Sequence, residues 1–219
     1  MDLTEFYFLP KEFPSDISNN SMGVVGKFKR FFELLAISNA QEIDAFIAND
    51  KVNFNSIPFY IRLTCYRLLL LQSVPSEVFV NRARKDIIKN IPAYNGCDIV
   101  KLLKEGDSNV NLFNEFNQIY ARNGAYFNEF YKNKLVPFLT KLLVATPKSM
   151  IEFLEPMQYD GYEQLIFFIR LLVYRIALLT EPDNERYLAL AVNDPCRYST
   201  SIIVEEYEPR LSRIRGNCK

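Results

Sequence analysis

In the N-terminal part of the chain, hydrophobic residues recur at helical spacing between polar capping residues and prolines. Ser21 and Ser76 stand where they can cap helices, and Pro58 fits the first turn of another, since the N–H that proline lacks would have no partner there. The pattern predicts four consecutive helices, over residues 22–37, 40–48, 58–71 and 75–90. It therefore indicates an all-α fold.

The third of these helices carries a phrase that occurs twice in the chain. Residues 59–71 read FYIRLTCYRLLLL, residues 167–179 read FFIRLLVYRIALL, and eight of the thirteen aligned positions are identical. The phrase is apolar almost all round, which is typical of a central helix buried by its neighbours. Around it, hydrophobic positions, caps and breakers keep one register, 108 residues apart, over roughly sixty residues. The sequence thus predicts two tandem copies of a four-helix unit.

The duplication divides the chain into segments that we expect to form one compact domain. A linker containing further helices joins the two units, and a short arm and a tail flank them. The expected segments are the arm (1–20), the first helical unit (21–95), the linker helices (96–134), the second helical unit (135–198) and the C-terminal tail (199–219).

The linker is expected to contain a short helix over Asp98–Lys104 and a long one from about Val110 to Lys132. Phe113, Tyr120 and Phe127 recur along the long helix at heptad spacing, so they share one face. Such a stripe usually packs into a core, and the alternative is an exposed groove for a partner. The candidate partner-binding residues of this helix are Tyr120, Tyr126 and Tyr131.

Each copy of the repeated phrase keeps two arginines five residues apart. Arg62 and Arg67 project about 140° apart around a helix, as do Arg170 and Arg175, so neither pair can form one patch. A buried guanidinium needs a partner or a route to solvent. We therefore expect structural ion pairs between these arginines and acids on adjacent helices. The acids found in the same place in both copies are Asp44 and Glu152, Glu77 and Glu185, and Asp86 and Asp194.

The alternative is that the arginines line a groove for an acidic partner or a phosphate, because a guanidinium fork suits both. A second basic cluster points to a partner more directly. Arg82, Arg84 and Lys85 lie in the fourth helix of the first unit, and the register replaces them in the second unit with Leu190, Val192 and Asn193. The copies have diverged there, so these three residues are candidates for partner binding. The equal alternative is that the second unit packs at this place against something that the first unit does not.

The amino-acid composition limits the kinds of catalytic and ligand-binding site that the chain can form. The chain has no histidine, which removes the commonest general base and the commonest metal ligand. Its four cysteines form no CxxC pair, and its seven glycines form no phosphate-binding loop. Twenty-six basic residues balance twenty-six acidic ones, so no overall field attracts nucleic acid or anionic lipid. We expect no catalytic residues, no cofactor and no metal site.

The chain shows no signal-peptide pattern. Its longest apolar stretch, residues 165–179, is too short to span a bilayer and contains Arg170 and Arg175. We therefore expect a soluble protein with reduced thiols and a cytoplasmic location.

Together these patterns favour a non-enzymatic protein-binding module, either an adaptor or a dedicated inhibitor of the toxin-immunity or host-directed kind. One alternative is a helical-repeat protein that binds nucleic acid through Arg82, Arg84, Lys85 and the basic C-terminal tail, although the balanced charge disfavours nucleic acid as a partner. A histidine-independent enzyme is the least favoured hypothesis. It would need a pocket with at least two carboxylates whose pKa values are perturbed.

Overall fold

The computed structural model describes residues 3, 31–49, 53–114, 136–155 and 163–194. Most of these residues are helical and they form no β-strand, which confirms the predicted all-α class. The expected N-terminal arm apart from Leu3, most of the long linker helix and the C-terminal tail lie outside the described residues.

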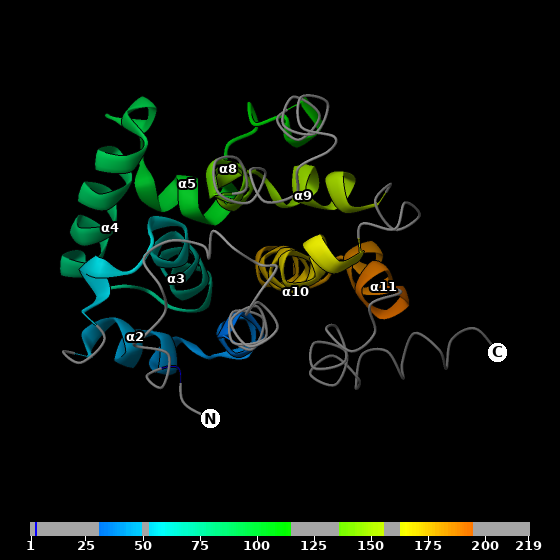
Figure 1. The fold of residues 1–219 in the computed structure, drawn as a ribbon, viewed down its shortest axis with the longest axis horizontal. Helices are drawn as coiled ribbons and strands as arrows, with labels where there is room; N and C mark the ends of the chain where they lie inside the picture. The colour runs from blue at the N-terminus through cyan, green and yellow to red at the C-terminus, as the bar shows by residue number, and fades with distance from the viewer. Residues whose placement is uncertain (1–2, 4–30, 50–52, 115–135, 156–162, 195–219) are drawn as a thin grey trace, which may run out of the picture.

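Figure 1 shows the described helices, coloured in chain order. A helix over residues 31–37 comes first. The elements after it are α2 (Ala40–Ala48), η2 (Phe54–Ser56), α3 (Phe59–Gln72), α4 (Glu77–Asn90), η3 (Pro92–Tyr94), α5 (Ile99–Glu105), α8 (Val136–Val144), α9 (Pro147–Leu154), α10 (Glu163–Thr180) and α11 (Glu185–Asn193).

Helices α3 and α10, which carry the two copies of the repeated phrase, pack against each other in the middle of the molecule (Figure 1). Helix α3 also packs against α2, α4, α5 and α8, and α10 packs against α9 and α11. Ten of the fourteen residues of α3 are buried, including the free thiol of Cys65. A helix enclosed on every side needs an apolar surface all round, and the repeated phrase supplies one.

Two of the four pairs of bounds of the central helices follow the predicted register. Helices α3 and α10 end at Gln72 and Thr180, and α4 and α11 begin at Glu77 and Glu185, in both cases 108 residues apart. The other two pairs do not: α10 begins 104 residues after the start of α3, and α11 ends 103 residues after the end of α4. The order of the helices is therefore the one that a duplication predicts. The duplication itself stays a prediction.

The N-caps of α4 and α11, Ser76 and Asn184, keep that register, whereas those of α2 and α9 depart from it by one residue. The sequence alignment places Ser38 opposite Thr146, and Thr146 does cap α9. The cap of α2, however, is Asn39, whose side chain accepts a hydrogen bond from the N–H of Glu42 at 3.0 Å. Ser38 instead donates to the carbonyl of Leu34 at 2.7 Å and helps to end the preceding helix. Ser38 and Asn39 can both cap a helix, so a shift of the helix start by one residue costs little free energy.

Groups from elsewhere in the chain complete the C-terminal end of α8. The last carbonyls of a helix have no partner within it. Nη1 of Arg67, from α3, donates to the carbonyls of Leu143 at 2.7 Å and Ala145 at 2.8 Å. The backbone N–H of Asp107 donates to the carbonyl of Val144, between them, at 2.7 Å. These three bonds join α3 and the end of α5 to α8.

Gly106 permits this close approach of α5 and α8. It ends α5 with a positive φ of 83°, a conformation that favours glycine. A Cβ atom added there would lie 2.4 Å from the carbonyl oxygen of Ala145, far inside van der Waals contact. The residue that ends the short linker helix therefore has to be a glycine for two independent reasons.

Candidate functional site

One arginine of the first repeated phrase binds an aspartate on the next helix. Arg62 of α3 donates from Nε and Nη2 to the two carboxylate oxygens of Asp86 on α4, each at 2.6 Å. This is the two-pronged geometry in which guanidinium and carboxylate bind most strongly. The hydroxyl of Tyr66, one turn after Arg62, donates to the same carboxylate at 3.2 Å. Nη1 of Arg62 donates to the carbonyls of Asn55, at 3.2 Å, and Ile57.

The second repeated phrase joins the same three residue types through different guanidinium atoms. Nη1 of Arg170 on α10 donates to Oδ2 of Asp194, directly after α11, at 2.8 Å. The hydroxyl of Tyr174 donates to that oxygen at 2.6 Å. In both copies the aspartate thus follows the arginine by 24 residues and the tyrosine by 20. We call each set an Arg–Tyr–Asp triad.

The two triads differ in their exposure to solvent. The side chains of Arg170 and Asp194 are 0% exposed, so the second triad is sealed inside the protein. Those of Arg62 and Asp86 are 11% and 14% exposed. The first triad is therefore less enclosed, and two of its members, Asp86 and Tyr66, line the floor of an open groove along α4.

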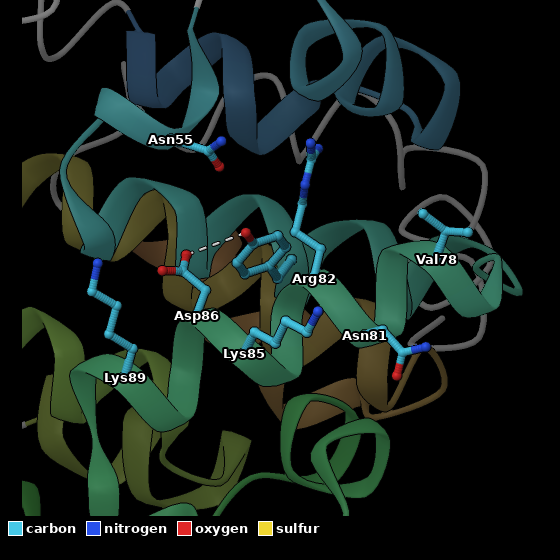
Figure 2. A pocket seen from close by; sticks show the side chains of 8 residues that line it. Asn55, Val78, Asn81, Arg82, Lys85, Asp86 and Lys89 are labelled. Carbon is cyan, nitrogen blue, oxygen red and sulfur yellow. Dashed lines mark hydrogen bonds between the residues drawn. The ribbon is translucent and has the colours of Figure 1, made fainter.

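We call this depression the α4 groove. It has a volume of about 540 Å³. Figure 2 shows its side chains, with Arg82, Lys85 and Lys89 succeeding one another along α4 and Asp86 bound to the hydroxyl of Tyr66. The lining residues are Asn55, Tyr66, Val78, Asn81, Arg82, Lys85, Asp86 and Lys89.

The α4 groove carries an uncompensated positive charge. Arg82, Lys85 and Lys89 are exposed, and within the described residues none of them makes an ion pair. Asp86 is the only carboxylate that lines the groove, and Arg62 already neutralises it. The pKa of Tyr66 is raised, chiefly by desolvation and then by the negative charge of Asp86, so its hydroxyl stays protonated. The groove can thus hold carboxylates or other anions at its rim.

The corresponding surface of the second unit has a different character. The register replaces Arg82 and Lys85 there with Leu190, which is partly buried against the core, and Asn193. The counterpart of Lys89 is Arg197, which lies outside the described residues. The second unit therefore lacks the counterparts of Arg82 and Lys85 beside its buried triad.

Arg84 does not belong to the α4 groove. It lines a separate depression with Ile88, Asn95, Cys97 and Asp98. Residues two apart on a helix project about 200° apart, so the basic cluster that the sequence singles out is divided between two faces of α4. Neither depression holds two carboxylates, the arrangement that a histidine-independent enzyme would need.

Arg67 does not bind an acid. It is fully buried, and its hydrogen bonds run only from Nη1 to the two carbonyls at the end of α8, while its Nε and Nη2 have no partner. Desolvation lowers the pKa of Arg67 to about 9, which leaves the guanidinium charged at neutral pH. Its charge faces the negative end of the α8 dipole, a favourable position for a cation. Our expectation of a carboxylate partner for Arg67 is therefore corrected.

The other expected partners of the arginines lie elsewhere. Asp44 is exposed on α2 and makes no ion pair with the described residues. Glu152 pairs with Lys148 on its own helix, at 3.8 Å. Arg175 is buried, with 4% of its surface exposed. The acids that bind Arg62 and Arg170 are instead Asp86 and Asp194, the third of the shared pairs.

Sequence reasoning left Lys89, Asn55 and Val78 out of the candidate residues. Lys89 follows Arg82 and Lys85 at helical spacing, and that periodicity could have identified it. Asn55 precedes α3 and reaches the groove only through the fold. The aromatic candidates Tyr120, Tyr126 and Tyr131 lie outside the described residues.

No group of three or more His, Cys, Asp or Glu side chains in the described ranges is arranged to hold a metal ion. None of the described helices is both long and apolar enough to cross a membrane. The chain matches no protein-family model, and comparison with curated proteins and with solved structures finds no significant similarity.

Proposed function

We propose that this protein is a non-enzymatic binding module, an adaptor or a dedicated inhibitor, that holds another protein in the α4 groove. The observation that carries the proposal is the difference between the two Arg–Tyr–Asp triads. One is sealed in the core, and the other adjoins a groove whose rim carries three cations that make no ion pair with the described residues. The second triad shows that an arginine, a tyrosine and an aspartate can be joined in a buried site. The stability of the fold therefore does not require the first triad to lie beside an exposed basic groove.

The chemistry of the groove supports binding more than catalysis. Its only carboxylate is held by two hydrogen bonds from Arg62 and one from Tyr66, so it is poorly placed to accept a proton from a substrate. The chain also has no histidine. Exposed basic side chains, by contrast, steer an acidic partner toward a surface and fix its register.

A protein partner fits the groove better than nucleic acid does. Arg82 and Lys85 line the α4 groove, but Arg84 lines another depression, so the three residues do not make one track for a phosphate backbone. The chain as a whole carries no net charge. Affinity for nucleic acid rests on many phosphate contacts made together.

Affinity capture from native cell extract, followed by mass spectrometry, tests the proposal. The bait is the full chain in three forms: wild type, the double variant Arg82→Glu/Lys85→Glu, and the control Arg84→Glu. The control makes the same kind of charge reversal on the same helix but outside the groove. We expect wild type and the control to retain one stoichiometric protein that the double variant loses.

Retention of that protein by all three baits would show that the α4 groove is not the binding surface. Capture of nucleic acid, lost steeply as salt rises, would favour the alternative function instead. If a protein is retained, an assay of its own activity in the complex separates the two roles. An inhibitor abolishes that activity, and an adaptor leaves it intact.

A further inference from the structure

The α4 groove has an apolar end as well as a basic one. Val78, in the first turn of α4, lines the groove although 80% of its surface is exposed. Val74, in the turn before α4, is 95% exposed. Figure 2 shows Val78 at one end of the groove and Lys89 at the other, with Arg82 and Lys85 between them. A ligand for this groove should therefore combine an apolar group with negative charge, in that order along α4.

The spacing of these residues suggests how long such a ligand is. Val78 and Lys89 are eleven residues apart on one helix, which corresponds to about 16 Å at 1.5 Å per residue. An extended peptide rises about 3.3 Å per residue, so five or six residues span that length. Alternate side chains of an extended peptide lie on one face about 6.6 Å apart. That interval is close to the turn of helix that separates successive cations of the groove.

The floor of the groove restricts how deeply an anion can enter. Asp86 lies there with its charge already matched by Arg62, and a second anion beside it would be repelled. Acidic groups of a ligand are therefore held at the rim by the three cations, while uncharged groups can approach the amides of Asn55 and Asn81. A peptide supplies both kinds of group, whereas a phosphodiester chain offers no apolar side chain for Val78.

We propose that the α4 groove binds a short, extended, acidic segment of its partner protein. A hydrophobic residue of that segment packs on Val78, and two or three carboxylates on the same face bind Arg82, Lys85 and Lys89. This inference rests on the proposed function and makes it specific. It states the chemistry of the bound segment and the order of its apolar and acidic residues along α4.

Fluorescence anisotropy with the full chain and a labelled synthetic peptide of six residues, Leu-Ser-Glu-Ser-Glu-Ser, tests the inference. The peptide places its leucine and two glutamates on one face when extended. We expect the Arg82→Glu/Lys85→Glu variant to weaken binding by about tenfold or more, which is about 1.4 kcal/mol, and Arg84→Glu to leave it unchanged. A peptide with glutamine in place of glutamate should not bind.

A double-mutant cycle tests the contact at the apolar end of the groove. Replacing the leucine of the peptide by serine, and Val78→Ser in the protein, should each weaken binding, and the two together should weaken it no further than one alone. All the substituted residues are exposed, so circular dichroism melts of the variants should match wild type.

Additive effects of the two serine changes would overturn the apolar contact. Equal binding of the peptide by the double variant and by wild type would overturn the inference. So would displacement of the peptide from the groove by a thymidine oligonucleotide of higher affinity. If the captured partner depends on Arg82 and Lys85 but the peptide does not bind, this inference fails alone. If the partner binds independently of both residues, the proposed function fails as well.

Discussion

Asp86 and Asp194 bind the same two residue types in different surroundings. Each accepts from an arginine and a tyrosine of the preceding long helix, but only Asp86 has access to solvent. Charge pairs lose little when water can replace a missing partner, and lose much when it cannot. The same substitution at the two positions should therefore have unequal effects on stability.

We predict that Asp194→Asn lowers the free energy of unfolding by about 3 kcal/mol or more, because it removes the carboxylate of a fully buried ion pair. Asp86→Asn should lower it by only about 1–2 kcal/mol, since water reaches Arg62 from the groove. Urea unfolding of both variants measures the difference. Equal losses would mean that the exposure of the first triad has no energetic consequence.

Arg67 allows a second prediction at this scale. In Arg67→Leu the carbonyls of Leu143 and Ala145 lose their bonds, at about 1–3 kcal/mol for each buried group. Removing a buried charge recovers part of that loss. We expect a net destabilisation of about 2 kcal/mol in denaturant titration. A variant as stable as wild type would show that the desolvation of the guanidinium outweighs its capping of α8.

The partners of the arginines could be predicted from the sequence only in part. Asp86 and Asp194 stand among three pairs of acids that recur at the same register, and spacing alone does not choose between them. The choice depends on which face of α4 turns toward α3. Arg67 could not be assigned at all, because its partners are backbone carbonyls of a helix 76 residues away in sequence.

At the scale of the elements, the junction of α5 with α8 depends on one residue without a side chain. Gly106 and Gly96 both have positive φ, 83° and 86°, so both favour glycine for its backbone. They differ in their surroundings. A Cβ on Gly106 would meet Ala145, and a Cβ on Gly96 would meet nothing within 4 Å. A substitution at Gly96 therefore measures the cost of backbone strain, and one at Gly106 measures the cost of strain together with a steric clash.

We predict that Gly96→Ala costs about 1 kcal/mol, the penalty for an L-residue in this conformation. Gly106→Ala should cost about 3 kcal/mol, because the clash with Ala145 adds a further 1–3 kcal/mol of overpacking. Thermal or urea unfolding measures both. Similar losses in the two variants would mean that α5 can move away from α8 at little cost.

The sequence predicted the helices better than their ends. The extents of α2, α3 and α4 follow the hydrophobic pattern closely, because burial and capping act on the same residues. The start of α9 departs from the register by one residue relative to α2, where Asn39 competes with the neighbouring Ser38 for the cap. The division of Arg82 and Arg84 between two faces could also have been predicted, from helical geometry alone.

On the scale of the whole molecule, several tyrosines are held neutral by the fold. Burial raises the pKa of Tyr60, of Tyr66 and of Tyr94 above the ordinary value of 10, with Asp86 and Asp107 adding to the effect for the last two. Below pH 10 the folded and unfolded chains both keep these protons. Above it, the unfolded chain releases them and the folded chain does not, so the free energy of unfolding falls as pH rises.

We therefore predict that the protein unfolds cooperatively in alkali above about pH 10, and that these tyrosines ionise only as it unfolds. Phenolate absorbance and far-ultraviolet circular dichroism, followed together during a pH titration, test this. The exposed tyrosines should ionise first and the remainder in step with the loss of helix. Complete ionisation with the helix signal intact would contradict the predicted burial.

Arg67 and the carbonyls that it caps lie 76 and 78 residues apart, in the first and the second of the two predicted units. A fragment that ended before α8 would keep the guanidinium of Arg67 and lose both of its acceptors. If the chain arose from a smaller ancestor by duplication, this contact is one that the single unit could not have made within itself. The first unit alone should therefore be less stable than its share of the core suggests.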